Sequence, residues 1–291
     1  MHFGPMRSKL FVPGSRPELF EKAWRSAADA ISFDLEDAVV PERKEEARTL
    51  VGSQIAARPA SNAQTTIVRV NQVGGTLFES DLDAVVRPGL DMINLPKTED
   101  ADEIRFAVER LERIEKERGI GTPVGILVNI ETPRGLRNAV HLASTSGRVA
   151  GLQLGFGDLF EPLGIERTEA TLLNVRLACR LAAAEADVPA YDGAFVAITD
   201  LEGFKAEAEA ARGLGLAGKS CVHPSQIAIA NAVFGPTPAQ ITRARRVVEA
   251  ADEMEPRGVG AFMVDGVMAD GPFIARAREI LRVAGPARGD V

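Results

Sequence analysis

The chain has 291 residues, of which 45% are hydrophobic and 26% charged, a composition typical of an ordinary globular protein. A net charge of −7 argues against nucleic acid as the main partner, and no apolar run is long enough to span a bilayer. The two cysteines, Cys179 and Cys221, have no metal-binding spacing and are expected to be reduced. Because the first residues contain no signal-like apolar stretch, we expect a cytoplasmic protein.

A strand, loop and helix pattern repeats through residues 1–235, and several strands are continuous apolar runs typical of parallel strands covered on both faces. The expected strands are Lys9–Pro13, Ala30–Leu35, Thr65–Asn71, Met92–Pro96, Val124–Ile130, Gly151–Gly155, Ala190–Phe195 and Lys219–His223. The expected helices are Pro17–Ala28, Pro41–Ala57, Asp100–Arg118, Pro133–Ala143, Thr168–Ala186, Leu201–Leu214 and Ser225–Val233. Eight such units predict an α/β protein with a (β/α)₈ TIM barrel rather than an open doubly wound sheet.

Residues 236–291 follow the completed barrel as a separate extension. We expect a charged helix over Thr237–Ala251, a short hairpin around Asp265 and Gly266, and a helix over Phe273–Ala284. Because the barrel needs none of these elements for closure, the extension is predicted to cover the barrel mouth or to cap the active site of a neighbouring subunit.

Polar side chains follow every predicted strand from the second onward. In a TIM barrel the carboxyl ends of the strands form the face that carries active sites. One polar residue there indicates a helix cap, whereas a ring of them predicts a functional site. The members of this ring are Glu36, Asp37, Arg69, Asn71, Lys97, Glu131, Asp158, Asp192 and His223.

Glu131 and Asp158 are the predicted metal ligands, because each closes an apolar strand and consecutive strands bring them to the same edge. Carboxylate oxygens suit Mg²⁺, which usually takes one or two carboxylates and leaves positions for substrate and water. Each residue alone also fits a capping role: Glu131 as an acid before a helix start, and Asp158 as a turn cap. The pair together favours the ion, Mg²⁺ or alternatively Mn²⁺.

Arg69 interrupts an apolar strand, so its guanidinium must meet an anion. Either substrate or the neighbouring acids Glu36 and Asp37 can supply that anion, and one arginine can serve both. The three close acids Asp34, Glu36 and Asp37 repel one another unless Arg69 or Mg²⁺-bound water binds them. Lys97 raises a rival chemistry, because a lysine at a strand end can form a Schiff base. We favour an anion contact or a salt bridge for Lys97. His223 is interpreted as a base or as a structural hydrogen-bonding residue.

Eight short segments in fixed order resemble the HpcH/HpaI aldolase and citrate lyase β-subunit family, especially its citrate lyase β-like and malyl-CoA lyase branch. The segments are Arg7-Ser-Lys-Leu-Phe-Val-Pro-Gly-Ser-Arg-Pro-Glu, Asp34-Leu-Glu-Asp-Ala-Val, Val68-Arg-Val-Asn, Leu95-Pro-Lys-Thr-Glu, Glu131-Thr-Pro-Arg-Gly, Gly155-Phe-Gly-Asp-Leu, Gly218-Lys-Ser-Cys-Val-His-Pro-Ser-Gln and Met268-Ala-Asp-Gly-Pro. They run through almost the whole chain.

The resemblance implies a TIM barrel with Mg²⁺ on Glu131 and Asp158 and with Arg69 at the substrate's oxygens. It also implies that Asp270, in the extension, acts as general acid and base in the site of a neighbouring protomer. Asp265 is the competing candidate and is interpreted as a turn residue. The family usually has a bulky apolar residue where this chain has Ala269, which leaves the geometry of the lid open.

On this basis we expect a Mg²⁺-dependent carbon–carbon lyase acting on a 3-hydroxy-carboxyacyl thioester, such as malyl-, citramalyl- or citryl-CoA. Three alternatives stay open: a malyl-CoA-type thioesterase, a metal-free aldolase using Lys97, and a non-catalytic or partner-dependent subunit that needs an acyl-carrier thioester. The expected partner is a small-molecule CoA or acyl-carrier thioester, with neither nucleic acid nor membrane involved, in a homo-oligomer of three or six chains. Substrate binding is assigned to Arg69, Glu36, Asp37 and Lys97, and Arg7 and Arg16 are candidates for CoA phosphates.

Overall fold

The computed structural model describes residues 3–59 and 62–284. The chain divides into two compact units, Met1–Asn231 and Ala232–Val291. Helix α10 (Ile227–Phe234) runs through the division between them. Each unit has its own cluster of buried apolar residues, so each is stabilised by its own core.

The first unit is built on eight parallel strands in the order β7-β6-β5-β4-β3-β2-β1-β8. Asp192, directly after β7, pairs in parallel with Lys219 of β8, and this bridge closes the sheet. The fold is therefore the predicted (β/α)₈ barrel. The strands are β1 (Ser8–Pro13), β2 (Ala30–Asp34), β3 (Thr65–Arg69), β4 (Met92–Leu95), β5 (Gly125–Ile130), β6 (Val149–Leu154), β7 (Ala190–Tyr191) and β8 (Lys219–Cys221).

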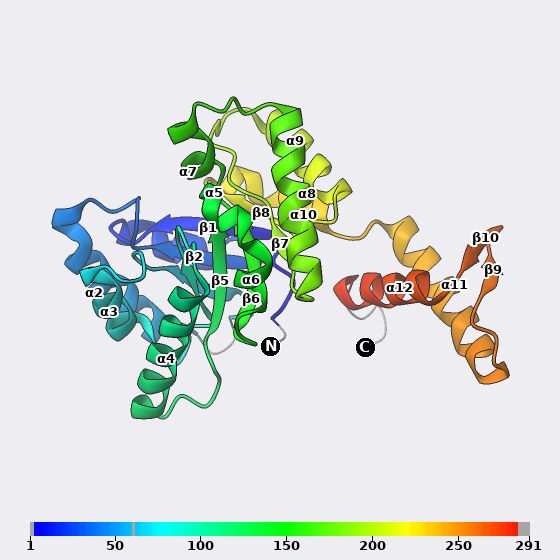
Figure 1. Cartoon of the computed structure of the whole chain (residues 1–291), viewed down its shortest axis with the longest axis horizontal. Coiled ribbons are helices and arrows are strands. Elements are labelled where there is room, and N and C mark those ends of the chain that lie inside the picture. The colour runs from blue at the N-terminus through cyan, green and yellow to red at the C-terminus, as the bar shows by residue number, and fades with distance from the viewer. Residues whose placement is uncertain (1–2, 60–61, 285–291) are drawn as a thin grey trace. The chain divides into compact units, whose positions relative to one another are not determined.

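Helices cover the outer face of this sheet, and Figure 1 shows α2, α3 and α4 packed in sequence outside the strands. No helix within the described residues combines the length and apolar composition that a membrane crossing requires. The remaining helices of the first unit are α1 (Phe20–Trp24), α2 (Lys44–Ala56), α3 (Thr76–Val85), α4 (Ala101–Arg118), α5 (Pro133–Arg137), α6 (Ala139–Ser144), α7 (Phe156–Phe160), α8 (Glu169–Glu185) and α9 (Leu201–Gly213).

Two of these helices, α3 and α7, were not predicted. Helix α3 buries Phe78, Leu82 and Val85 at helical spacing, but the acids between them obscure the apolar pattern. Helix α7 has only five residues, too few to show a period. The single helix expected over Pro133–Ala143 is also wrong, because the structure has α5 and α6 meeting at Asn138.

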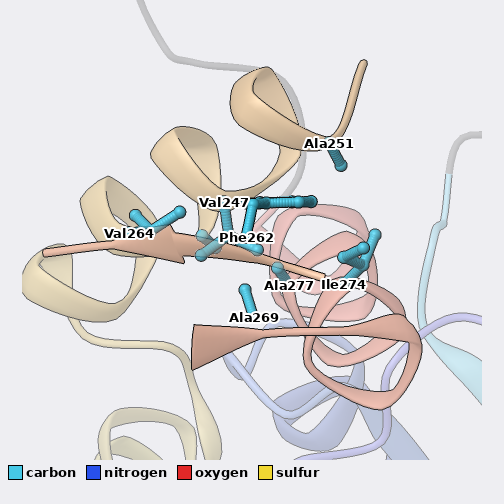
Figure 2. Packing of buried hydrophobic residues seen from close by; sticks show 8 residues of the cluster. Val247, Ala251, Phe262, Val264, Ala269, Ile274 and Ala277 are labelled. Carbon is cyan, nitrogen blue, oxygen red and sulfur yellow. The ribbon is translucent and has the colours of Figure 1, made fainter. Parts of the chain in front are cut away.

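The second unit contains two helices and a hairpin around a small core. Helix α11 (Pro238–Met254) begins with a capping box in which Thr237 and Gln240 bond each other's backbone N–H groups. Strands β9 (Phe262–Val264) and β10 (Val267–Ala269) form the hairpin that the sequence predicts, and α12 (Gly271–Ala284) follows. Figure 2 shows side chains of both helices and both strands meeting in one apolar cluster.

The turn of this hairpin needs two residues that can adopt positive φ angles. Asp265 and Gly266 have positive φ angles of 52° and 75°. Two positive φ angles in a two-residue loop are typical of a type I′ turn, whose twist matches that of paired strands. Asp265 also pairs with Arg246 of α11 at 3.0 Å. Asp265 is therefore a turn residue, as interpreted from the sequence.

Candidate active site

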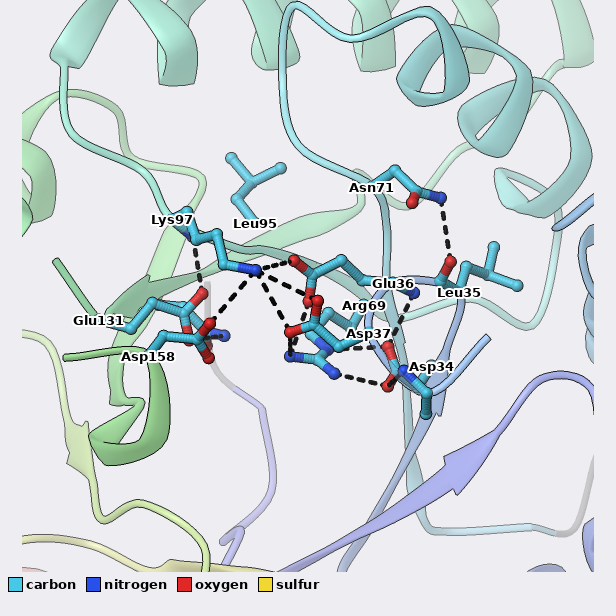
Figure 3. A network of polar contacts seen from close by, with 12 residues as sticks. Asp34, Leu35, Glu36, Asp37, Arg69, Asn71, Leu95, Lys97, Glu131 and Asp158 are labelled. Atoms are coloured by element: carbon cyan, nitrogen blue, oxygen red, sulfur yellow. Dashed lines mark hydrogen bonds and ion pairs between the residues drawn. The ribbon is translucent and has the colours of Figure 1, made fainter. Parts of the chain in front are cut away.

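The carboxyl ends of five consecutive strands bring six of the predicted residues into one cluster (Figure 3). Arg69 is the last residue of β3, and Glu131 comes directly after β5. Asp158 lies in the first turn of α7, after β6. Because all these strands are parallel, their carboxyl ends share one edge of the barrel. The full cluster, here called the mouth cluster, contains Asp34, Glu36, Asp37, Arg69, Lys97, Glu131 and Asp158.

Glu131 is a buried carboxylate that is held only by neutral donors. Its residue is 2% exposed. The backbone N–H of Lys97 donates to Oε1 at 2.7 Å, and the Asn129 side-chain amide donates to Oε2 at 3.1 Å. Burial, followed by the negative charge of Asp158, raises the pKa of Glu131 to about 7. A cation bound beside this carboxylate would stabilise its ionised form.

Gly155, the residue after β6, makes room for Glu131. A Cβ atom at this position would lie 2.2 Å from Glu131 Oε2, well inside van der Waals contact. The glycine of the segment Gly155-Phe-Gly-Asp158 is therefore required by a carboxylate from the neighbouring strand, and not by a phosphate group. Sequence inspection gave no signal for this contact, because it joins two strands.

Lys97 bridges the acids of the mouth cluster. Its Nζ lies 2.6 Å from Glu36 Oε1, 3.3 Å from Asp37 and 3.3 Å from Asp158 Oδ1. Burial opposes the charged form, but the hydrogen bond to Glu36 and the negative charges of Glu36, Asp158 and Asp37 together outweigh it and raise the pKa of Lys97. The residue adopts a φ of +49°, a strained value for a non-glycine residue that is often found at functional sites. A protonated, ion-paired amine is a poor nucleophile, so the geometry disfavours Schiff-base chemistry here.

Arg69 is fixed by a bidentate contact with Asp34, one of the three neighbouring acids that the sequence offered as its partners. Its Nε and Nη2 lie 2.8 Å and 2.5 Å from the two oxygens of Asp34, and its Nη1 lies 2.8 Å from Glu36 Oε2. Burial opposes the guanidinium charge, yet the hydrogen bonds to Asp34 raise the pKa of Arg69. Asp37 is the most distant of the three acids, at 3.6 Å. Arg69 therefore remains charged and rigidly placed.

Three residues of the ring lie outside the mouth cluster: Asp192, His223 and Asn71. Asp192 points outward into a buried ionic cluster, here called the β7–β8 clamp and formed by Arg167, Arg176, Asp192, Glu207 and Lys219. The alternation of the strand explains this, because Tyr191 points into the barrel and its successor must point out. His223 is exposed and accepts from the Ser225 N–H at a helix start, which is the structural role considered for it.

Asn71, Arg7 and Arg16, also considered as site or ligand-binding residues, make structural contacts instead. Asn71 is buried and bonds Asp81 of α3 through its backbone and side-chain amides. Arg7 pairs with Asp29 before β2, at the amino ends of the strands, and is therefore remote from the mouth. Arg16 pairs with Glu18 in the loop after β1.

Asp270 lies in the second unit, directly after β10. Its carbonyl accepts from the Ile274 N–H at 2.9 Å, which places it at the start of α12. Its side-chain Oδ1 is buried and has no hydrogen-bond partner among the described residues. Asp270 is thus free of the turn and ion-pair roles that occupy Asp265.

Sequence reasoning missed two residues close to the cluster. Asn129 holds Glu131, and strand alternation places both on one face of β5. Lys9 of β1 is 3% exposed, and its Nζ lies 4.6 Å from the centroid of the Phe11 ring. Burial and then the charge of Arg69 lower the pKa of Lys9 to about 7. The sequence signal that could have identified Lys9 is its position as a lysine within a predicted apolar strand.

The donor set of the mouth cluster fits a hard divalent cation. Glu131 and Asp158 both contact Lys97, so their carboxylates lie on the same side of the barrel. Within residues 3–59 and 62–284, no group of three or more His, Cys, Asp or Glu side chains is arranged to hold a metal ion. Two carboxylates with open positions suit Mg²⁺ rather than Zn²⁺.

The fold and the acidic mouth define the chain as a (β/α)₈ barrel with a candidate site for a divalent cation. The chain belongs to the HpcH/HpaI aldolase/citrate lyase family, whose model matches residues 7–224. It is 38% identical to the citrate lyase subunit beta of Escherichia coli (strain K12) over 278 residues, covering 94% of this chain and 92% of the relative. It is 36% identical to a (3S)-malyl-CoA thioesterase of Cereibacter sphaeroides over 282 residues, covering 96% and 95%.

A solved structure of CitE from Mycobacterium tuberculosis, in complex with magnesium, acetoacetate and coenzyme A, matches with a TM-score of 0.73 and 31% identity. The match covers 98% of this chain and 99% of that chain. A citrate lyase beta subunit from the same organism, complexed with oxaloacetate and magnesium, matches with a TM-score of 0.67 and 29% identity over 80% of this chain. The family resemblance read from the sequence is therefore confirmed.

Proposed function

We propose that this protein is a Mg²⁺-dependent carbon–carbon lyase. It cleaves, or in reverse forms, a 3-hydroxy-carboxyacyl thioester such as malyl-, citramalyl- or citryl-CoA, giving an oxo acid and an acyl thioester. The observation that carries the proposal is Glu131: a buried carboxylate without a cationic partner among the described side chains, beside a second carboxylate, at the barrel face that carries active sites. Relatives crystallised with magnesium, oxaloacetate and coenzyme A support it.

Each residue of the mouth has a role in this reaction. Glu131 and Asp158 hold the ion, which when bound supplies a Lewis acid for the substrate's hydroxyl and carboxylate oxygens. Arg69, immobilised by Asp34, presents a fixed positive charge to the oxygen that becomes negative as the carbon–carbon bond breaks. Lys97, Glu36 and Asp37 line the same mouth and orient the substrate.

Asp270 is proposed as the general acid and base. In cleavage its protonated carboxyl gives a proton to the enolate carbon of the departing thioester, and in condensation the carboxylate removes that proton. We propose that the extension brings Asp270 to the mouth of a neighbouring copy of the chain. Co-expression of Asp270→Asn with Glu131→Gln tests this, because a mixed oligomer pairs an intact mouth with an intact extension and regains activity. If Asp270 serves its own chain, the mixture stays inactive.

Screening a panel of CoA thioesters with Mg²⁺ tests the function. The expected result is release of an oxo acid and an acyl-CoA, abolished by EDTA and by Glu131→Ala or Asp158→Ala. His223→Ala is the matched control, since this exposed cap lies outside the mouth cluster and its loss leaves activity intact. Full activity in EDTA would exclude the metal assignment.

A thioesterase is the second candidate, favoured by the 36% identity to (3S)-malyl-CoA thioesterase over 96% of this chain. Both activities need the same carboxylates and arginine, and their products separate them. Cleavage of malyl-CoA yields glyoxylate and acetyl-CoA, whereas hydrolysis yields free malate and CoA. Product analysis with one substrate therefore decides between the two.

A partner-dependent subunit is the third candidate, favoured by identity to chains named citrate lyase subunit beta. Such a subunit would take its acyl group from a carrier protein rather than from free CoA. Activity with CoA thioesters alone contradicts this candidate. Activity only after addition of an acylated carrier supports it.

A further inference from the structure

The interior of the barrel contains a polar layer below the mouth cluster. TIM-barrel interiors are filled by layers of four side chains, each layer contributed by alternate strands and usually rich in Val, Ile and Leu. Here the layer from β2, β4, β6 and β8 carries no apolar side chain. Its members, here called the polar layer, are Ser32, Asn94, Gln153 and Ser220, all at most 2% exposed.

Strand alternation places the first two members inside the barrel. Phe33 packs outward on Phe20 of α1, with ring centroids 5.0 Å apart, so its neighbour Ser32 points inward. Met92 packs in an apolar cluster with Ile67 and Leu127 of the two neighbouring strands, β3 and β5. Asn94, two residues further along β4, lies on the same face as Met92 and therefore also points inward.

The same reasoning places the other two. Gln153 is in register with Asn129, whose amide reaches Glu131 inside the mouth. Lys219 points outward to the β7–β8 clamp, so its neighbour Ser220 points inward, in register with Lys9. All four members therefore face the barrel axis.

Every member of the polar layer has a polar atom that no protein group satisfies. Within the described residues, buried side-chain atoms without a hydrogen-bond partner include Ser32 Oγ, both amide atoms of Asn94, Gln153 Oε1 and Ser220 Oγ. The same holds for Lys9 Nζ and for Asn129 Oδ1, which flank the layer. Buried polar groups are almost always hydrogen-bonded, to protein or to ordered water. Serine side chains are too short to reach across a barrel, so water is the partner that fits.

The donors and acceptors are complementary. Lys9 contributes an amine, while Asn94, Asn129 and Gln153 contribute carbonyl oxygens. Asn129 uses its amide nitrogen for Glu131, which leaves its oxygen directed away from that carboxylate. A hydrogen bond to that oxygen would fix the amide plane and, through it, the orientation of Glu131.

We propose that the polar layer binds a cluster of ordered water molecules that connects Lys9 to Asn129 and thereby positions Glu131 for metal binding. The consequence for the metal rests on the proposed function, whereas the water site does not. An apolar layer would be the more stable choice for a barrel core, because unsatisfied buried polar groups are destabilising. Proteins place polar side chains in an otherwise apolar core mainly where function requires it. Lys9, Asn94 and Gln153 are thus positioning residues.

A high-resolution crystal structure of the metal-free protein tests the water site directly. The expected result is ordered solvent in contact with Asn94 and Gln153 inside the barrel. Side chains that bond one another, with no ordered solvent between them, would overturn the proposal. This outcome does not depend on whether the protein binds Mg²⁺.

Two near-isosteric variants test the positioning role. Asn94→Leu and Lys9→Met are expected to weaken Mg²⁺ binding about tenfold, measured by titration calorimetry, while the unfolding midpoint stays equal or rises. Ile67→Val, an interior apolar change on β3, is the control: it lowers the midpoint and leaves Mg²⁺ affinity unchanged. If either polar variant fails to fold, Ser32→Ala provides the smaller perturbation. If the crystal structure shows ordered solvent but Asn94→Leu, Lys9→Met and Ser32→Ala all bind Mg²⁺ as tightly as the wild type, the positioning role is refuted. A wild-type protein that binds no Mg²⁺ would refute the proposed function instead.

Discussion

The mouth cluster and the β7–β8 clamp are both largely buried ionic clusters of the barrel, but their charges are balanced differently. In the clamp, Asp192 is bound by Arg176 at 2.8 Å and by Lys219 at 2.5 Å. Glu207 is bound by Lys219 at 3.1 Å and by Arg167 at 2.8 Å. Arg176 also lies 3.3 Å from Glu207, so Asp192 has two cationic partners and Glu207 has three.

The mouth cluster has the opposite balance. Its carboxylates share only Arg69 and Lys97 as cationic partners among the described residues, and Glu131 contacts neither guanidinium nor ammonium. Burying charge without a partner is unfavourable, whereas a paired buried cluster holds a structure in place. The clamp is therefore complete as it stands, whereas the unpaired carboxylate of the mouth supports the proposal that a cation binds there.

Glu131→Gln should have the largest effect and should separate activity from stability. Loss of one of two metal-binding carboxylates is expected to lower kcat/KM about 10³-fold or more, equivalent to about 4 kcal/mol or more of transition-state stabilisation. The same change removes a buried charge, so the metal-free variant should unfold at a higher temperature at pH 8 than the wild type. Steady-state kinetics and calorimetric melting in EDTA measure the two effects. A variant that melts lower would show that Glu131 is already satisfied without metal.

Lys219→Met should reverse that pattern. It leaves Asp192 and Glu207 with fewer partners in a fully buried place, for which about 3 to 4 kcal/mol of destabilisation is expected. Urea unfolding gives the stability, and the Mg²⁺ dissociation constant of the folded fraction should match that of the wild type. Lys205→Met is a suitable control, because the Lys205–Glu209 pair is half-exposed and contributes little. Lost Mg²⁺ binding would mean that the two clusters are coupled.

The sequence predicted the mouth better than the clamp. Periodicity and strand ends were enough to bring Arg69, Glu131 and Asp158 to one edge, since parallel strands share their carboxyl ends. Their roles in catalysis and metal binding remain predictions. Asp192 was assigned to the same ring on an expected strand over Ala190–Phe195, whereas β7 ends at Tyr191 and has only two residues, too few for alternation to show which way the next side chain points. The outward pairing depends on α8 and α9, which no strand pattern reveals.

Gly155→Ala should disturb the mouth alone. The added methyl group would lie 2.2 Å from Glu131 Oε2 and 2.6 Å from Glu131 Cβ, so the carboxylate must move away from Asn129 and the backbone that carries it must shift. Mg²⁺ affinity is expected to fall about 10- to 100-fold, the usual effect of displacing the support of a metal ligand. Gly157→Ala is the matched control two residues away, because a Cβ there meets no atom within 4 Å. Titration calorimetry compares the two, and equal affinities would show that this shift of Glu131 does not affect metal binding.

The β7–β8 clamp and the mouth cluster should change the stability of the protein in opposite directions as the pH rises. Burial opposes ionisation of Glu207, but its bonds to Arg167 and Lys219 lower its pKa from 4.5 to about 2, so its contribution is present above pH 4.5 and is lost as the pH falls to 2. Glu131 has its pKa raised from 4.5 to about 7, so the folded state binds the extra proton in that window and stability falls as the pH rises from 4.5 to 7. Each shift corresponds to about 3 kcal/mol.

Urea unfolding of the metal-free protein from pH 2 to 8 measures this profile. Stability should rise up to about pH 4.5 and then decline toward pH 7, with Glu36, whose pKa is also raised by burial, adding to the decline. Glu131→Gln should flatten the decline and leave the acid limb unchanged, because the clamp is intact. Since Mg²⁺ requires the ionised carboxylate, its binding below pH 7 should also release about one proton, detectable by calorimetry in buffers of different ionisation enthalpy. If the stability of Glu131→Gln still declines as the pH rises toward 7, the decline is due to Glu36. Mg²⁺ binding would then not be linked to proton release from Glu131.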